Sequence, residues 1–307
     1  MIKLYNEYSQ YLKLKYGEKV YKLPVNISCT CPNRDGTLGY GGCTFCADVG
    51  TGFEMLDNSL SVKEQLKQNM EYISKKYKAN KFIAYFQNYT NTYMDMEKFK
   101  NYINDALMDN IVEIAISTRP DCISEDKLKF LYEIQNKYNV NISIELGLQT
   151  VNYHTLKTIN RGHTLAEFID AVLRIKRYNF EICTHIILNL PNDDIIDTIE
   201  TAKILSVLKV DQVKIHSLYI MDNTEMGRLY KNKEITVISK DEYVERVVVF
   251  LEHLNEDIVV QRLAGRAPKE NSLFVNWGMS WWRIKDEILC KMESEKRYQG
   301  NKNKFKY

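Results

Sequence analysis

The sequence predicts an α/β fold in which the strands of a parallel sheet alternate with helices. Two observations predict it. Short apolar segments rich in β-branched and aromatic residues recur along the chain, as expected of buried strands. Between them lie amphipathic segments, several of which begin with a capping box, where a hydroxyl side chain and a Glu three residues later bond each other's backbone amides. Strands that alternate with helices in this way form βαβ units, whose strands are parallel.

The predicted elements follow in a regular order as far as about residue 220. Six strands are expected, at 20–27, 81–86, 111–117, 141–148, 181–190 and 210–219. Capping boxes mark three helix starts, at Ser61 with Glu64, Thr164 with Glu167, and Ser239 with Glu242. After Asp222 the pattern becomes less regular. We therefore predict a domain at 1–220 and an accessory segment at 221–307.

Length, composition and charge narrow the class of protein. The chain has 307 residues, of which 45% are hydrophobic and 27% charged, and this is typical of a globular protein. Its net charge of +2 is unevenly spread, because residues 1–22 carry +3 and residues 291–307 carry +4. We expect the last seventeen residues to form a frayed basic tail. A polyanion would find its attractive surface at the two ends of the chain.

The sequence shows no sign of membrane insertion or export. No apolar run approaches the roughly 20 residues that a spanning helix needs, and the first residues lack the pattern of a signal peptide. We therefore expect no membrane association and a cytoplasmic location. Seven cysteines in such a chain argue against a disulfide framework, because the compartment is reducing.

Polar segments follow every predicted strand. In a parallel sheet or barrel, active groups gather at the carboxyl ends of the strands. A cysteine cluster follows the first strand, and polar segments that follow the others begin at 87, 118, 147, 189 and 216. We expect these segments to form one large polar site.

Four cysteines of the cluster, Cys29, Cys31, Cys43 and Cys46, lie within eighteen residues. Two residues between thiolates allow both sulfurs to reach one ion or one face of a cluster. One interpretation is a zinc site that uses all four. The other is a [4Fe–4S] cluster held by three of them, with one iron left open. The spacing alone leaves both interpretations open.

The segment Cys43-Thr-Phe45-Cys46 resembles the signature of radical S-adenosylmethionine (radical SAM) enzymes. Eleven residues separate Cys31 from Cys43, whereas the commonest form of the signature has three. The longer form is similar to that of the YhcC/YtqA branch, a relative of the catalytic subunit of Elongator. The resemblance extends over most of the chain, through 85–92, 118–122, 145–150, 161–164, 185–191 and 260–262.

This resemblance implies a partial (β/α)6 barrel, similar to a TIM barrel but open on one side, with a short N-terminal helix and a C-terminal extension. It implies Cys31, Cys43 and Cys46 as ligands of a [4Fe–4S] cluster whose fourth iron is chelated by S-adenosylmethionine. Arg161 is suited to the carboxylate of that cofactor. The residues expected to bind S-adenosylmethionine are Phe45, Gln87, Thr90, Asn91, Glu145, Gln149 and Arg161.

Several residues have both a functional and a structural interpretation. Cys122 and His185 are the candidates for catalytic contact with substrate, although a free Cys is often a small buried hydrophobe and a His is often held by structural hydrogen bonds. Glu145 either faces a cofactor or pairs with Arg119 or Lys214. Aromatic residues near both ends, Tyr5, Tyr8, Tyr11, Tyr16, Trp277, Trp281 and Trp282, either stack on RNA or pack on the barrel.

The function implied by the resemblance is that of an enzyme that reductively cleaves S-adenosylmethionine to a 5′-deoxyadenosyl radical. Its expected substrate is the wobble uridine of tRNA, converted from carboxymethylaminomethyluridine to aminomethyluridine, and its expected electron donor is a flavodoxin or ferredoxin. A radical SAM enzyme acting on a tetrapyrrole, another small molecule or a protein is one alternative. A zinc-ribbon module that binds nucleic acid is the other.

Overall fold

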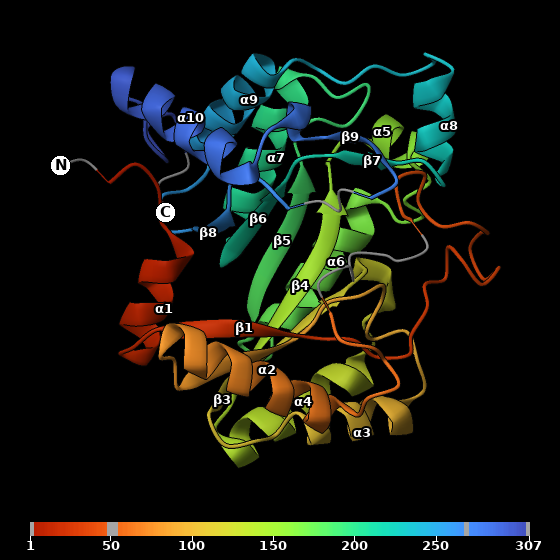
Figure 1. Cartoon of the computed structure of the whole chain (residues 1–307), viewed down its shortest axis with the longest axis vertical. Helices are drawn as coiled ribbons and strands as arrows, with labels where there is room; N and C mark the ends of the chain where they lie inside the picture. The colour runs from red at the N-terminus through yellow and green to blue at the C-terminus, as the bar shows by residue number, and fades with distance from the viewer. Residues whose placement is uncertain (1–2, 48–54, 267–269, 305–307) are drawn as a thin grey trace.

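The computed structural model describes residues 3–47, 55–266 and 270–304. Within them, seven parallel strands form one sheet in the order β1-β2-β3-β4-β5-β6-β8. Their bounds are β1 (Val20–Val25), β2 (Lys81–Phe86), β3 (Ile111–Thr118), β4 (Asn141–Gln149), β5 (Glu181–Ile187), β6 (Gln212–His216) and β8 (Val259–Arg262). The sheet curls into an open half-barrel with helices on its outer side (Figure 1). The predicted α/β fold and partial barrel are confirmed.

Ten α-helices surround the sheet in the described part of the chain. They are α1 (Tyr8–Tyr16), α2 (Val62–Tyr77), α3 (Met96–Asp105), α4 (Glu125–Tyr138), α5 (Tyr153–Thr158), α6 (Leu165–Lys176), α7 (Ile195–Val207), α8 (Glu225–Lys231), α9 (Lys240–His253) and α10 (Trp281–Ser294). Complete capping boxes begin α2 at Ser61 and α6 at Thr164, as predicted. At Ser239 the side chain accepts from the amide of Glu242 and so caps α9.

The sheet differs from the prediction at its last strands. All six predicted strands are present, but the sixth ends at His216. The chain then starts β7 (Tyr219–Met221), which pairs antiparallel with β9 (Ser272–Val275) in a separate two-stranded sheet. A seventh parallel strand, β8, comes from the segment after residue 220 and pairs with β6. Four residues between two irregular stretches carry too little periodicity to predict a strand.

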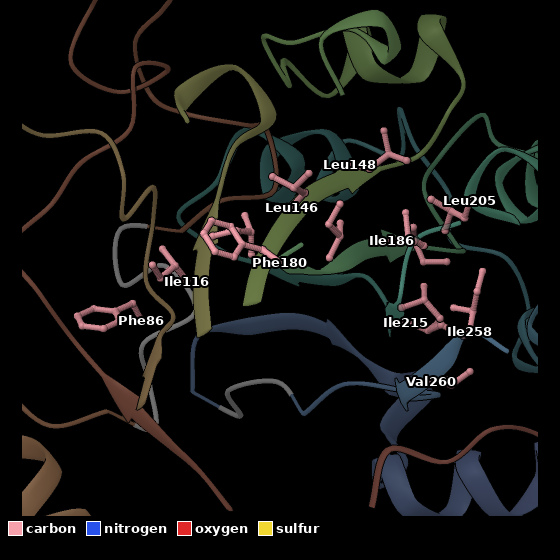
Figure 2. Packing of buried hydrophobic residues seen from close by; sticks show 14 of the residues in the cluster. Phe86, Ile116, Leu146, Leu148, Phe180, Ile186, Leu205, Ile215, Ile258 and Val260 are labelled. Atoms are coloured by element: carbon pink, nitrogen blue, oxygen red, sulfur yellow. The ribbon is translucent and has the colours of Figure 1, made fainter. Parts of the chain in front are cut away.

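Alternation along the strands separates an apolar outer face from a polar inner face. Ile116, Leu146, Ile186 and Ile215 are fully buried and belong to the core between sheet and helices (Figure 2). The residue next to each of them in sequence is polar and faces the interior of the half-barrel, because successive side chains of a strand point to opposite faces. These inner residues are Ser117, Glu145, His185 and Lys214.

Helix α1 packs at the amino-terminal ends of the strands. The Tyr16 hydroxyl donates to Glu113 of β3 at 2.7 Å, and the Tyr11 hydroxyl donates to Glu181 of β5. Tyr8, Tyr11 and Tyr16 all pack against an apolar cluster that includes Leu12. The packing interpretation of these tyrosines is confirmed. This basic end of the chain lies at the opposite end of the sheet from the carboxyl edge.

The basic segment at the other end is ordered as far as residue 304, so the expectation of a frayed tail is wrong for 291–304. Arg297 lies 2.6 Å from Glu252 and 2.9 Å from Glu245, both on α9. Lys302 also pairs with Glu252, at 2.8 Å. These ion pairs neutralise the charges of Arg297 and Lys302, which we expected from the sequence to attract a polyanion. Residues 305–307 lie outside the described part.

Trp277 packs against Tyr243 and Phe274, and its indole N–H donates to the carbonyl oxygen of Ile238 at 2.8 Å. This confirms the packing interpretation for Trp277. Trp281 is partly buried against the core, whereas Trp282 is 50% exposed.

None of the helices in the described residues has the length and apolar character needed to cross a membrane.

Candidate active site

A cavity of about 260 Å³ opens at the carboxyl edge of the sheet. Ten of the twelve residues predicted for the site line it: Cys31, Cys43, Phe45, Cys46, Gln87, Thr90, Glu145, Gln149, Arg161 and His185. They come from loops and strands that are far apart in sequence. The structure therefore brings these residues together at one edge of the sheet, whereas their roles remain predictions.

The two remaining residues lie outside the lining of this cavity. Asn91 is buried, and its side-chain amide donates to the carbonyl oxygens of Phe86 and Ser117, which fixes the loop after β2. Cys122 lines a different groove, together with Asp121 and Lys127. Burial raises the pKa of the Cys122 thiol to about 12, and Asp121 adds to this effect. The structure thus gives no positional support to Cys122 as a catalytic residue or to Asn91 as a cofactor ligand.

The cysteine loop is tied to the connection between α5 and α6. The side-chain amide of Asn33 donates to the carbonyl oxygen of Asn160 at 2.6 Å, and that of Asn160 donates to the carbonyl oxygen of Gly42 at 2.9 Å. Gly42 has φ +84°, a conformation in which glycine is favoured. The long spacing between Cys31 and Cys43 is thereby folded into a braced loop.

Each of the three predicted ligand sulfurs has a guanidinium group beside it. Nη1 of Arg119 lies 3.9 Å from Cys31 Sγ, and Nη1 of Arg161 lies 3.6 Å from Cys43 Sγ. Nη1 of Arg34 lies 3.5 Å from Cys46 Sγ. Cationic donors stabilise thiolates, the form in which cysteine binds metal.

This donor set fits an iron–sulfur cluster. Burial raises the pKa of Cys46 to about 11, and Cys43 adds to that shift while Arg34 opposes it. A metal would displace the proton from such a thiol. Cys29 is absent from the cavity lining, and its thiol donates to the carbonyl oxygen of Asn88 at 3.4 Å. Three sulfurs rather than four therefore face the cavity.

Thr90 and Gln149 also fit a bound polar cofactor. The Thr90 hydroxyl is buried at the cavity without a hydrogen-bond partner among the described residues. Such a group is costly unless a ligand or water satisfies it. Gln149 has φ +79°, at an irregularity in the pairing of β4 with β5. Strained backbone of this kind is concentrated at ligand sites.

Arg161 is held by the protein itself. Its Nη2 and Nε donate to the carbonyl oxygen of Gly147, at 2.6 and 3.2 Å. His163 approaches the same oxygen at 3.0 Å, and burial lowers the pKa of His163 to about 3. Gly147 is needed here, because a Cβ at this position would lie 2.6 Å from Arg161 Nη2.

Glu145 is the centre of an ion-pair network on the inner wall. It is fully buried and pairs with Lys22 and with Lys214, at 3.2 Å for the latter, but not with Arg119. His185 Nε2 lies 2.7 Å from Glu145 Oε2, the oxygen that Lys214 also contacts, whereas Lys22 contacts Oε1. The attraction of Lys214 and Lys22 outweighs burial and holds the pKa of Glu145 well below its usual range. Sequence reasoning considered Lys214 only as a partner for this carboxylate.

Further lining residues were missed from the sequence. They are Arg34, Tyr85, Arg119, Tyr219, Arg262 and Arg266. Strand parity could have found Tyr85, which lies on the inner face of β2. Arg262 was part of a motif, but no strand was predicted there.

Similarity to known proteins identifies the class of protein. Residues 25–205 match the radical SAM superfamily, and residues 210–294 match the radical SAM C-terminal domain. The chain belongs to the radical SAM superfamily. The superfamily's cofactors are the two predicted, a [4Fe–4S] cluster and S-adenosylmethionine, and membership argues against the zinc-ribbon alternative.

Particular relatives refine this assignment. The chain is 34% identical to the uncharacterized protein YtqA of Bacillus subtilis over 302 residues, which cover 97% of this chain and 92% of YtqA. It is 26% identical to the tRNA uridine(34) acetyltransferase of Methanocaldococcus jannaschii over 146 residues, 47% of this chain and 26% of that protein. The structure of Elp3 from Methanocaldococcus infernus has the same fold, with a TM-score of 0.69 at 17% identity over 91% of this chain and 64% of Elp3.

Proposed function

We propose that this protein is a radical SAM enzyme that modifies the wobble uridine of tRNA, converting carboxymethylaminomethyluridine to aminomethyluridine. The observation that carries the proposal is a cavity in which three cysteines face a wall that carries several cationic side chains. The tRNA substrate is supported by the partial match to a tRNA uridine(34) acetyltransferase, since nucleotide 34 of a tRNA is the wobble position.

The residues of the chain divide between two tasks. When bound, the cofactors would supply the means to abstract one hydrogen atom from the methylene group beside the substrate carboxylate and to accept one further electron. Hydrolysis of the resulting imine by water would then release the carboxymethyl carbons as glyoxylate and leave the aminomethyl group on the uridine. Cys31, Cys43 and Cys46 would hold the cluster, and the three guanidinium groups beside them offset its negative charge. Phe45, Gln87, Thr90, Gln149 and Arg161 would surround S-adenosylmethionine. Glu145 and His185 line the same cavity, and we assign both to the substrate, although the sequence resemblance placed Glu145 among the residues that bind S-adenosylmethionine.

The proposal includes a cytoplasmic location and a flavodoxin or ferredoxin as electron donor. All seven cysteines are free, as a reducing compartment requires. A low-potential cluster needs an external one-electron donor.

Anaerobic turnover tests this function. The reconstituted protein, reduced with dithionite, is incubated with S-adenosylmethionine and tRNA that carries carboxymethylaminomethyluridine, and nucleosides are measured by mass spectrometry. We expect aminomethyluridine and 5′-deoxyadenosine to appear together, and neither to appear with Cys31→Ala. Formation of 5′-deoxyadenosine with the tRNA unchanged would assign the enzyme to a different substrate.

A further inference from the structure

The inner wall of the cavity is a row of polar residues set by strand register. Glu145 on β4 pairs in register with Cys183 on β5, His185 on β5 pairs with Lys214 on β6, and Lys214 pairs with Arg262 on β8. The side chains of Glu145, His185, Lys214 and Arg262 all line the cavity. Parallel pairing thus brings an acid, an imidazole, an ammonium and a guanidinium side by side.

Positive charge exceeds negative charge along this wall. Burial lowers the pKa of His185 to about 4 and that of His216 well below its usual range, so both imidazoles are neutral at pH 7. One carboxylate, Glu145, therefore faces the charges of Lys22, Lys214 and Arg262. It is already paired with the two lysines.

Arg262 lacks a carboxylate partner among the described residues. Its Nη2 donates to the ring of His216, a neutral acceptor, and its Nε has no hydrogen-bond partner within the described part of the chain. Arg262 is partly buried at the cavity wall, and a guanidinium that is withdrawn from water without a counter-charge is stabilised by a bound anion. A planar guanidinium suits a carboxylate in particular, because it offers two parallel donors.

A metal ion does not fit this wall. One ligand atom from each of Glu145, Cys183 and His185 lies within 4.8 Å of the others, a spacing that would suit a metal. The ammonium groups of Lys22 and Lys214, however, already occupy both oxygens of Glu145. A divalent cation would join a group that is already net positive, whereas an anion would neutralise it.

We propose that Lys214 and Arg262 form a subsite for a carboxylate group of the substrate. Glu145 and His216 act as positioning residues that hold these two cations at the cavity wall. This inference rests on the proposed function, in which the carboxymethyl group that is lost from the uridine carries the carboxylate. The subsite would fix that group against the β6 and β8 part of the cavity wall.

The test compares an acid with its neutral isostere. One tRNA carries carboxymethylaminomethyluridine, and a second carries the primary amide of the same side chain. We expect the wild-type enzyme to prefer the acid by about tenfold or more in kcat/KM, as for loss of one charge-assisted pair. In Arg262→Gln and Lys214→Gln this preference should fall to about twofold or less.

Two variants guard against a merely structural effect. Lys22→Gln removes a charge from the same carboxylate, but Lys22 is not part of the cavity lining, so the variant should keep the preference for the acid. Lys214→Arg keeps the positive charge, so this variant should also keep the preference for the acid. A wild-type enzyme that accepts acid and amide equally, or an acid preference that survives both Gln variants, overturns the subsite while leaving the proposed function standing.

The subsite can also be judged if neither tRNA is modified. Isothermal titration with the free nucleosides then replaces turnover as the measurement. Tighter binding of 5-carboxymethylaminomethyluridine than of its amide, lost in Arg262→Gln, would support the subsite although the tRNA function had failed. Equal binding, or no binding of either nucleoside, would overturn both.

Discussion

Asn33 and Asn160 brace the cysteine loop reciprocally, since the Asn33 amide donates to the Asn160 carbonyl and the Asn160 amide donates to the carbonyl of Gly42. Asn33 also donates to the carbonyl oxygen of Arg161, at 3.1 Å. The loop that carries the cysteines and the residue that contacts Cys43 are therefore positioned by the same side chain.

Asn33→Ala should weaken cluster retention with little loss of the overall fold, because the bonds it removes are local to the cysteine loop. We expect less iron per chain after anaerobic reconstitution and a far-ultraviolet circular dichroism spectrum like that of the wild type. Gly162→Ala should do the same, because a Cβ there would lie 2.3 Å from Asn33 Oδ1.

Gly17→Ala is the matched control for this prediction. Gly17 and Gly162 have φ values of +78° and +74°, so Ala is strained by about 1 kcal/mol at either position. A Cβ at Gly17 meets nothing within 4 Å. Equal loss of iron in Gly17→Ala and Gly162→Ala would show that general destabilisation, rather than the Asn33 brace, was responsible.

The three cysteines of the cavity should each be indispensable for the cluster. Ala at position 31, 43 or 46 removes one thiolate ligand, and we expect reconstituted protein to lose most of the about four irons that a [4Fe–4S] cluster contains. Cys29→Ala should retain them, because that thiol bonds Asn88 instead. Iron and sulfide analysis measures both results. A Cys29→Ala variant without iron would show that Cys29 is also needed for metal binding and would contradict the three-cysteine assignment.

Buried histidines should make the apoprotein less stable in mild acid. The pKa of His163 is lowered to about 3 by burial, with Arg161 adding to the effect, whereas an unfolded histidine titrates near about 6.5. The unfolded chain therefore binds more protons as the pH falls below about 6.5, and folding stability decreases. Between pH 6.5 and 5, this one residue should account for about 2 kcal/mol.

Urea denaturation of wild type and His163→Gln across this pH range checks the prediction. The variant should lose less stability on acidification by about the same 2 kcal/mol, since glutamine does not titrate. Parallel stability profiles for the two proteins would contradict the neutral, buried state of His163.

Arg297 should contribute strongly to stability although it lies near the end of the chain. Arg297→Ala leaves Glu252, which is 1% exposed, with only the half-exposed Lys302 as a partner. Breaking a buried pair in this way costs about 3 kcal/mol. Lys75→Ala breaks a pair of the same 2.6 Å length with Glu71 on the surface, and it should cost about 0.5 kcal/mol or less. Thermal or urea unfolding would separate the two, and equal losses would contradict the prediction.

The sequence predicted what depends on local pattern. Apolar alternation located the six strands, and the capping residues Ser61 and Thr164 located helix starts, because both signals lie within a few residues of one another. The rule that active groups gather at carboxyl ends then brought Cys31, Gln87, Gln149 and His185 to one cavity.

What the sequence did not predict depends on long-range geometry. The guanidinium groups of Arg34, Arg119 and Arg161 approach three different sulfurs from three different loops, and no spacing in the sequence indicates this. Cys122 follows a strand as the cavity residues do, yet the short helix at Pro120–Cys122 carries it into another groove. The charged tail appeared free because its partners on α9 lie about fifty residues earlier.

The edge of the sheet at β8 joins both ends of the chain. The amide of Val260 donates to the carbonyl oxygen of Asn6 at 2.8 Å, and Gln299 bonds both Leu4 and Ile258. Figure 1 shows the first segment, β8 and the last helix side by side. Since β8 also carries Arg262, the first and last described segments are hydrogen-bonded next to a strand that contributes to the cavity wall. We therefore expect an affinity tag beside either segment to alter the measured substrate preference, and tag-free protein is the reference for kinetics.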